Sequence, residues 1–173
     1  LMTTAQAHPN IALVKYWGKQ DSPGNLPAAQ NLSITLAGLT TTTRVSEADD
    51  DGIWLNDKPT EDAKISRWLA RLRGTFDIPP LHITSHNDFP TSAGLASSAS
   101  GFAALITAIN AHCQLGLNAE MCSEWARMGS ASAARSLFGG FVALVPPIWQ
   151  AVPLAKSAHW PLEVVVAVTS NEA

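Results

Sequence analysis

The chain of 173 residues has few cysteines, little charge and no long apolar run. Cys113 and Cys122 are too few to staple a chain of this length, so we interpret them as buried, reduced thiols of a cytoplasmic protein. With 11 basic against 14 acidic residues, the chain lacks the basic surplus of a nucleic-acid-binding protein. The apolar stretches 102–109 and 164–168 are far shorter than the roughly 20 residues of a membrane span, and no signal peptide is visible. We therefore expect neither nucleic acid nor a membrane as a partner.

Length and composition predict one folded domain. A chain of 173 residues is close to an average domain in length, and 46% of its residues are apolar. The low charge and ordinary apolar content argue against disorder. The acidic run at residues 49–51 is expected to form a solvated turn rather than a metal site, because consecutive side chains do not converge on one point.

Hydrophobic periodicity predicts both strands and helices. Residues 32–36 alternate apolar and polar, as in a half-buried strand, and the β-branched run 40–45 is expected to pair with them. Residues 61–73 are predicted to form a helix that Thr60 caps. The spacing i, i+3, i+4, i+7 gives this helix one apolar stripe, made by Ile65, Trp68, Leu69 and Leu72. Another helix is predicted to follow its cap at Asn118.

A loop of small residues at 88–101 leads directly into a long predicted helix. The free backbone N–H groups at such a helix start, together with the helix dipole, form an anion site suited to phosphate. Gly94 permits a close approach of the backbone to a ligand, and Ser97 and Ser98 add hydroxyls for phosphate or Mg²⁺. The spacing fits neither a Walker loop nor a dinucleotide fingerprint, and a plain serine cap explains this segment equally well when it is taken alone.

Two further segments suit anions. If a helix begins near Ser130, Ser132 and Arg135 lie on one of its faces, and a guanidinium beside hydroxyls suits a carboxylate or a phosphate. The alternative is an arginine paired with a surface acid. Near the N-terminus, Lys15 and Lys19 flank a tyrosine and a tryptophan, an unusual grouping in a chain with few basic residues. Three such segments together favour a phosphate-bearing ligand more strongly than any one of them.

These segments resemble the motifs of diphosphomevalonate decarboxylases, in the galactokinase/homoserine kinase/mevalonate kinase superfamily. Residues 7–19 (AHPNIALVKYWGK) resemble the N-terminal signature, residues 87–99 (NDFPTSAGLASSA) the ATP loop and residues 129–142 (GSASAARSLFGGFV) the third motif. The resemblance implies an α+β fold, the N-terminal half of the superfamily fold (ribosomal protein S5 domain 2-like), with a mixed sheet and helices on one face. Residues 1–173 would then be the N-terminal ATP- and substrate-binding domain, with the C-terminal half absent from this chain.

The resemblance also implies a reaction. The family uses ATP to phosphorylate the tertiary hydroxyl of mevalonate 5-diphosphate, and loss of that phosphate and of CO₂ yields isopentenyl diphosphate in the mevalonate pathway of isoprenoid biosynthesis. ATP and Mg²⁺ are the implied cofactors, and a homodimer is the expected assembly. Two alternatives stay open: a mevalonate or phosphomevalonate kinase or decarboxylase of the same superfamily, and a nucleotide-binding fragment without turnover.

Roles follow from motif position. The resemblance implies that the ATP phosphates lie on Ser92, Ala93, Gly94, Leu95, Ala96, Ser97 and Ser98. Ser98 would also contact Mg²⁺. It implies that the substrate lies on Asn10, Tyr16, Trp17, Lys19, Asn25, Ser130, Ser132 and Arg135. Arg135 would clamp the carboxylate and, with Lys15 and Ser98, belongs to the expected catalytic set.

The chain departs from the family pattern in three places. Ala131 stands where the family has Gly, which restricts backbone freedom beside two expected ligands, and Ala134 stands where it has Cys. Residues 29–31 read Ala-Gln-Asn where the family commonly has Asn-Ser-Ser, which bears on the number of phosphates on the substrate. The family's catalytic Asp has no counterpart here and is expected in the C-terminal half. Asp21 and Asp88 are interpreted as a turn residue and a cap.

Overall fold

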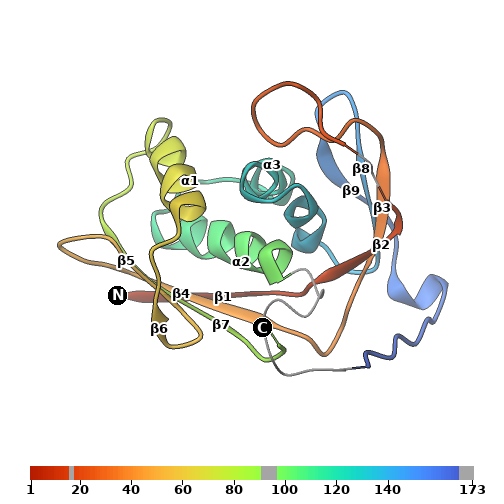
Figure 1. The fold of residues 1–173 in the computed structure, drawn as a ribbon, viewed down its shortest axis with the longest axis horizontal. Coiled ribbons are helices and arrows are strands. Elements are labelled where there is room, and N and C mark those ends of the chain that lie inside the picture. The colour runs from red at the N-terminus through yellow and green to blue at the C-terminus, as the bar shows by residue number, and fades with distance from the viewer. Residues whose placement is uncertain (16–17, 91–96, 168–173) are drawn as a thin grey trace.

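The computed structural model describes residues 1–15, 18–90 and 97–167, which form an α+β fold with two sheets (Figure 1). In chain order its elements are β1 (Met2–Ala7), β2 (Asn10–Val14), β3 (Asn31–Thr35), β4 (Thr41–Glu47), β5 (Gly52–Leu55), β6 (Lys58–Pro59), α1 (Ala63–Arg73), β7 (Leu81–Asn87), α2 (Ser97–His112), α3 (Ala119–Gly129), the 3₁₀ helix η1 (Ala131–Leu137), β8 (Phe141–Val145), β9 (Gln150–Ala155) and the 3₁₀ helix η2 (Ser157–His159).

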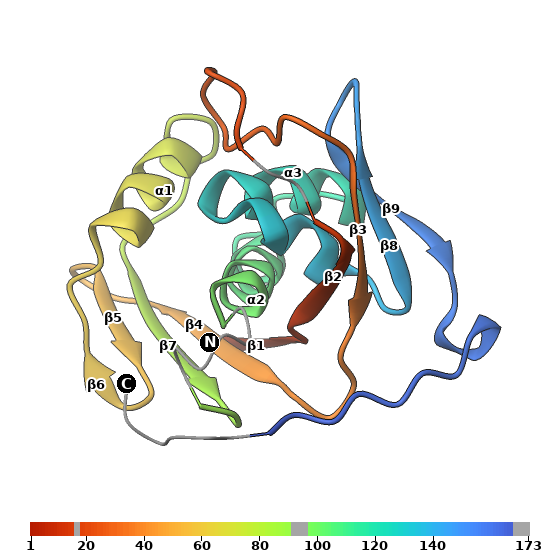
Figure 2. The same cartoon turned by 45° about the vertical axis from the view of Figure 1, so that its right-hand side comes forward.

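The larger sheet has its strands in the order β1-β4-β7-β5-β6. Strands β5 and β7 run parallel, whereas the other neighbouring pairs run antiparallel. Helices α1 and α2 lie on one face of this sheet, and α2 crosses β1 and β4 (Figures 1 and 2). The predicted α+β class, with a mixed sheet and helices on one face, is therefore confirmed.

The smaller sheet has four antiparallel strands in the order β2-β3-β8-β9 and packs against η1 and α3. The predicted pairing of residues 32–36 with residues 40–45 is wrong. Strand β3 joins β2 and β8 in this sheet, whereas β4 joins β1 and β7 in the larger one. Between the two sheets Gly38 has a φ of +85°, which glycine adopts without steric cost. This turn lets consecutive strands enter different sheets.

Helix α1 buries the stripe that its sequence predicts, namely Ile65, Trp68, Leu69 and Leu72. Its cap is not Thr60 but Asp62, whose carboxylate accepts hydrogen bonds from the backbone N of Lys64 (2.7 Å) and of Ile65 (3.1 Å). Thr60 donates instead to the Lys58 carbonyl oxygen. The helix thus begins at Ala63, and its apolar stripe is unaffected.

Helix α2 forms the centre of the main hydrophobic core. It is buried on most sides and packs against the larger sheet, α3 and η1. Ala103, Ala104 and Ala108 are fully buried, and their small side chains let neighbouring elements approach closely. No helix within residues 1–15, 18–90 and 97–167 combines the length and the apolar character that a membrane span requires.

The acidic turn at residues 49–51 is anchored to α1 and β7 through Asp51. Asp51 accepts two hydrogen bonds from Arg73, at 2.6 and 2.7 Å, and a third from the backbone N of Leu81 at 2.8 Å. The hydrogen bond from Arg73 lowers the pKa of Asp51. Among the described residues, no group of three or more His, Cys, Asp or Glu side chains is arranged to hold a metal ion.

Candidate functional site

Three serine hydroxyls connect two of the sequence motifs. Ser98, in the first turn of α2, has its Oγ 3.3 Å from the Oγ of Ser130. The Ser130 Oγ in turn lies 3.3 Å from the Oγ of Ser132, at the start of η1. Ser98 is exposed, and the other two are partly exposed. Ser98 and Ser130 are 32 residues apart in the chain. The start of α2 and the start of η1 therefore bring hydroxyls from separate segments to one place.

A glycine makes this meeting possible. A Cβ atom on Gly129, the last residue of α3, would lie 2.2 Å from the Cδ1 atom of Phe102 on α2. The end of α3 therefore rests directly on the Phe102 ring, which places Ser130 beside α2. Ala131 is buried in the first turn of η1, a conformation that alanine adopts readily, so the departure from the family's glycine is accommodated here.

Arg135 is buried inside this region, with 2% of its surface exposed. Its Nε donates to the Oγ of Ser33 (2.8 Å), its Nη1 to the Oδ1 of Asn31 and its Nη2 to the Oδ1 of Asn10 (3.3 Å). This burial shows that Arg135 is not a surface residue. These three acceptors fix the plane of the guanidinium.

Asn10 is buried next to Arg135 and does not lie on the open surface. Its Nδ2 donates to the Ser132 carbonyl oxygen (3.0 Å) and to the Ser136 Oγ (2.7 Å), so it ties β2 to η1. Sequence reasoning assigned no role to Ser33, although a serine in a strand of alternating residues is a signal for one polar face. The same reasoning noted Asn31 as a departure without foreseeing its contact with Arg135.

The loop at residues 18–27 is anchored to the end of α3. Lys19 Nζ donates to the Oδ1 of Asn25 (2.8 Å), and Asn25 Nδ2 donates to the Met128 carbonyl oxygen (2.7 Å). Arg127, which is buried, donates to the carbonyl oxygens of Gly24 and Trp149. Arg127 was missed by sequence reasoning, although it lies only two residues before the third motif. These contacts hold Lys19 and its loop against the end of α3.

Several of the expected site residues lie outside the described residues. These are Tyr16 and Trp17, together with the part of the ATP loop formed by Ser92, Ala93, Gly94, Leu95 and Ala96. Lys15 follows β2 and is exposed. The structure therefore places Ser97 and Ser98 from the ATP loop, and all of the expected residues of the third motif.

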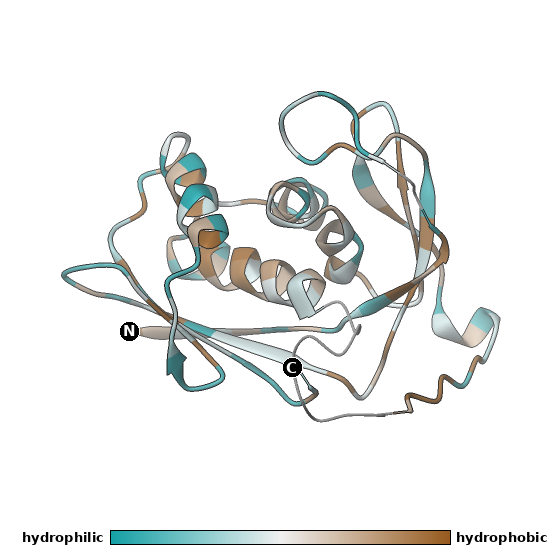
Figure 3. Ribbon diagram, viewed as in Figure 1, coloured by the Kyte–Doolittle hydropathy of each residue, from teal (hydrophilic) through white to brown (hydrophobic). Residues whose placement is uncertain are grey.

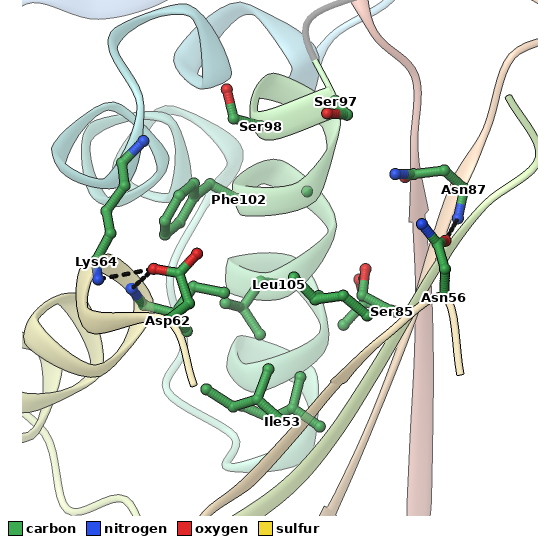
Figure 4. A pocket seen from close by; sticks show the side chains of 15 residues that line it. Ile53, Asn56, Asp62, Lys64, Ser85, Asn87, Ser97, Ser98, Phe102 and Leu105 are labelled. Carbon is green, nitrogen blue, oxygen red and sulfur yellow. Dashed lines mark hydrogen bonds between the residues drawn. The ribbon is translucent and has the colours of Figure 1, made fainter. Parts of the chain in front are cut away.

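A cavity of about 240 Å³ lies between α1, α2 and the larger sheet, next to Ser97 and Ser98 (Figure 4). Apolar side chains form much of its wall, namely Ile53, Leu55, Ile65, Ile83, Phe102 and Leu105. Asn56 and Asn87 add polar groups, and the Asn56 Oδ1 accepts a hydrogen bond from the Asn87 backbone N (2.9 Å). Sequence reasoning did not find this cavity, because its lining comes from separate elements.

Lys64 also lines the cavity, with its Nζ 5.2 Å from the centre of the Phe102 ring. Figure 4 shows its ammonium directed toward the end of the cavity where Ser98 lies. Loss of hydration lowers the pKa of Lys64, and repulsion from Lys19 lowers it further, against the opposing effect of Asp62. An apolar cavity that opens beside hydroxyls, a helix N-terminus and two lysines suits a flat apolar group that carries an anion.

Comparisons with known proteins agree with this chemistry. A family model described as the diphosphomevalonate decarboxylase-like N-terminal domain matches residues 7–147. The chain is 40% identical over 195 residues to a diphosphomevalonate decarboxylase of Candida albicans. The aligned region covers 94% of this chain and 52% of that protein. The chain spans about half the length of the curated relatives it matches.

Solved structures give the same result. The fold is similar to that of a mevalonate diphosphate decarboxylase from Enterococcus faecalis, with a TM-score of 0.81, 38% identity, and coverage of 90% of this chain and 52% of that chain. It is also similar to a protein solved in complex with MVAPP, AMPPCP and magnesium, with a TM-score of 0.82, 38% identity, and coverage of 92% and 52%.

Proposed function

Because this chain belongs to the family of diphosphomevalonate decarboxylase-like N-terminal domains, we propose that residues 1–173 form the N-terminal, ATP- and substrate-binding half of a diphosphomevalonate decarboxylase. The enzyme would convert mevalonate 5-diphosphate and ATP into isopentenyl diphosphate, ADP, phosphate and CO₂. The observation that carries this proposal is the contact between Ser98 and Ser130, which joins the ATP-loop helix to the third motif.

The nucleotide is proposed to lie along α2. The apolar cavity beside Ser97 and Ser98 would hold the base, and the helix start would bind the phosphates. Residues 92–96 complete this site by motif position. The Ser98 hydroxyl is a suitable oxygen ligand for Mg²⁺, which would neutralise charge on the phosphates. A solved complex of a similar protein contains AMPPCP and magnesium, in support of both ligands.

The substrate is proposed to lie between Lys19 and Arg135. Lys19, with Tyr16 and the hydroxyls of Ser130 and Ser132, would bind the diphosphate, and Arg135 would bind the carboxylate in its fixed plane. Asn10, which contacts both Ser132 and Arg135, would orient these two residues. Lys15, Trp17 and Asn25 would shape the rest of the site. In this arrangement the tertiary carbon of the substrate would lie between the two anionic ends, near the serines proposed to face the ATP phosphates.

The proton acceptor is proposed to lie in the C-terminal half of the enzyme. In the first step the tertiary hydroxyl oxygen attacks the γ-phosphorus, its proton passes to a carboxylate and ADP leaves. In the second step the C–O bond to phosphate and the C–C bond to the carboxylate both break, which forms the alkene and CO₂. Asp88 is instead proposed to act as a cap, since its carboxylate accepts a hydrogen bond from the Thr40 backbone N (2.7 Å). Asp21 is exposed in the 18–27 loop.

ATP consumption by the full-length protein tests the substrate. We expect kcat/KM for mevalonate 5-diphosphate to exceed the values for mevalonate 5-phosphate and for mevalonate, because Lys19 binds the second phosphate. Lys19→Met is expected to reduce this preference, whereas Lys58→Met on β6 serves as a matched exposed control. An equal or higher kcat/KM for mevalonate or its monophosphate would contradict the proposal and support the alternative kinase or phosphomevalonate enzyme. The homodimer expected from the resemblance stays a prediction.

A further inference from the structure

Arg127, near the end of α3, is a buried arginine that bonds to two other segments of the chain. Only 4% of its surface is exposed. Its Nε donates to the carbonyl oxygen of Trp149 (3.0 Å), directly before β9, and its Nη1 donates to the carbonyl oxygen of Gly24 in the 18–27 loop. The planar guanidinium holds both acceptors in a fixed geometry, and its charge strengthens both hydrogen bonds. Arg127 therefore bridges this loop to the start of β9.

The Trp149 side of the bridge belongs to the buried core. Trp149 is 7% exposed and packs in the same apolar cluster as Leu144. One turn earlier on α3, the Ser123 Oγ accepts a hydrogen bond from the Ala151 backbone N (3.0 Å). Two contacts from one helix therefore fix this end of β9, and Arg127 reaches the loop from a well-supported position.

The 18–27 loop is held mainly by polar contacts. It is mostly hydrophilic (Figure 3), and residues 18–23 are exposed. Leu26 packs against the apolar cluster that contains Trp149, and the Gln20 backbone N donates to the Leu26 carbonyl oxygen (2.9 Å), which closes the base of the loop. The tip of the loop at residues 24–25 is instead fixed by its hydrogen bonds to α3.

The tip has a backbone conformation that fits these hydrogen bonds. Gly24 and Asn25 have φ values of +98° and +55°, a left-handed conformation that glycine and asparagine adopt most readily. A Cβ atom on Gly24 would lie 3.3 Å from the Arg127 Nη1, so the loop backbone rests closely on the guanidinium. Next to it, the Asn25 Nδ2 donates to the Met128 carbonyl oxygen (2.7 Å). Arg127 and its neighbour in α3 thus fix two consecutive loop residues.

Asn25 connects the anchored tip to Lys19. Its Oδ1 accepts a hydrogen bond from the Lys19 Nζ (2.8 Å). This bond uses one of the three N–H donors of the ammonium and leaves the others for a ligand. Lys19 is exposed, and an exposed lysine side chain loses conformational entropy when it binds an anion. Holding the ammonium in one place beforehand reduces that loss and strengthens binding.

We propose that Arg127 is a positioning residue for the substrate diphosphate, because through the loop tip at residues 24–25 it holds the Lys19 ammonium where the second phosphate binds. This inference rests on the proposed function, in which Lys19 binds the diphosphate. The described hydrogen bonds of the Arg127 guanidinium go to carbonyl oxygens of the chain, so the residue acts through the loop. Its loss affects substrate binding and spares the nucleotide site beside Ser98.

Steady-state kinetics of the full-length protein test this role. Arg127→Gln is expected to raise KM for mevalonate 5-diphosphate by about tenfold. We expect kcat, and KM for ATP at saturating substrate, to change by less than about twofold. An unchanged KM for mevalonate 5-diphosphate, or an equal rise in KM for ATP, would overturn the proposal.

Arg71→Gln is the matched control. Burial lowers the pKa of Arg127, and the positive charge of the nearby Arg71 lowers it further. Arg71 is exposed on α1, so its substitution removes an equal charge from the same region without removing the bridge to the loop. We expect Arg71→Gln to leave KM for mevalonate 5-diphosphate within about twofold of the wild-type value. An equal rise in KM for the two variants would show that charge alone acts, and would overturn the proposal.

A double-mutant cycle with Lys19→Met separates positioning from general damage to the fold. Because Arg127 acts through Lys19, the double variant is expected to lose no more kcat/KM for mevalonate 5-diphosphate than Lys19→Met alone. Losses that multiply would overturn the proposal, since the two residues would then act independently. If Arg127→Gln does not fold, Arg127→Lys, which keeps the charge but not the planar fork, takes its place in the same cycle.

Hydrogen exchange measured by mass spectrometry gives a readout that does not depend on turnover. The amides of Gln20 and Ala28 donate to the Leu26 and Gly18 carbonyl oxygens within the loop. In Arg127→Gln these amides are expected to exchange at least about threefold faster than in the wild type, with exchange in α2 unchanged. Unchanged exchange in the loop would overturn the proposal. Faster loop exchange in a full-length protein that does not convert mevalonate 5-diphosphate would support the anchoring role of Arg127 while contradicting the proposed function.

Discussion

Arg135 shows how the site is built at the scale of a single residue. Its fork of donors is held by Ser33, Asn31 and Asn10, which come from two strands of the smaller sheet. The asparagine at position 31 stands where the family commonly has serine, and it reaches the guanidinium directly. In this chain, position 31 therefore supports Arg135.

Arg135→Lys is expected to reduce kcat/KM for the diphosphate substrate by about 100-fold, or roughly 3 kcal/mol of transition-state binding. Lysine keeps the charge but not the planar fork, and it leaves buried acceptors on Asn31 and Ser33 without their donor. Steady-state kinetics measure the loss, and circular dichroism checks that the fold is retained. Unchanged turnover in a folded variant would show that Arg135 does not bind the carboxylate.

Ser98→Ala is expected to reduce kcat/KM for ATP by about 10- to 100-fold, because a hydroxyl is lost from the helix start that we propose to bind the ATP phosphates. Ser66→Ala is the matched control, since Ser66 is an exposed serine in the first turns of α1 that bonds only to the Asp62 carbonyl oxygen in the described structure. Kinetics with varied ATP give both values. Equal effects of the two substitutions would remove Ser98 from the nucleotide site.

Asp51→Asn is expected to destabilise the chain by about 1 kcal/mol at pH 7, the magnitude of a partly exposed ion pair screened by solvent. The pKa of Asp51 is lowered by Arg73 in the folded state, so its contribution is present above the unfolded pKa and disappears as the pH falls below about 3.8. Urea unfolding at pH 7 and at pH 3 measures the difference. A stability gap that persists unchanged at pH 3 would contradict this sign.

At the scale of elements, hydrophobic periodicity predicted where helices and strands form, but it did not predict which strands pair. The apolar stripe of α1 follows from local spacing alone, and the Asn118 cap of α3 is confirmed by its hydrogen bond to the Met121 backbone N. The alternation in β3 predicts a strand, but not which face is buried. That choice depends on Arg135, about a hundred residues later in the chain. The Ser33 hydroxyl, on the polar side of β3, accepts a hydrogen bond from the Arg135 Nε, and the polar side of the strand therefore faces the interior.

Gly129→Ala tests the contact between two elements. The added Cβ would overlap the Phe102 ring, so the end of α3 must shift, and we expect a loss of about 1–3 kcal/mol in unfolding free energy. ATP binding should weaken as well, because Ser130 moves away from Ser98. Combining Gly129→Ala with Phe102→Leu is expected to recover part of the stability, as measured by urea unfolding. Full stability of the single variant would contradict the close packing.

At the scale of the whole molecule, the site lies where the larger sheet, α2 and the smaller sheet meet. Sequence motifs indicated the anion-binding segments separately, and the fold brings Ser98, Ser130 and Arg135 into one region. The cavity could not be predicted, because residues from both helices and from the larger sheet must come together before it exists.

We propose that this chain supplies the phosphate-binding half of an enzyme that couples phosphoryl transfer to decarboxylation. The most direct test is to measure ADP and CO₂ in the same reaction, with the full-length protein, mevalonate 5-diphosphate, ATP and Mg²⁺. We expect one CO₂ to be released for each ADP formed. Formation of ADP without CO₂ would contradict it and identify the protein as a kinase.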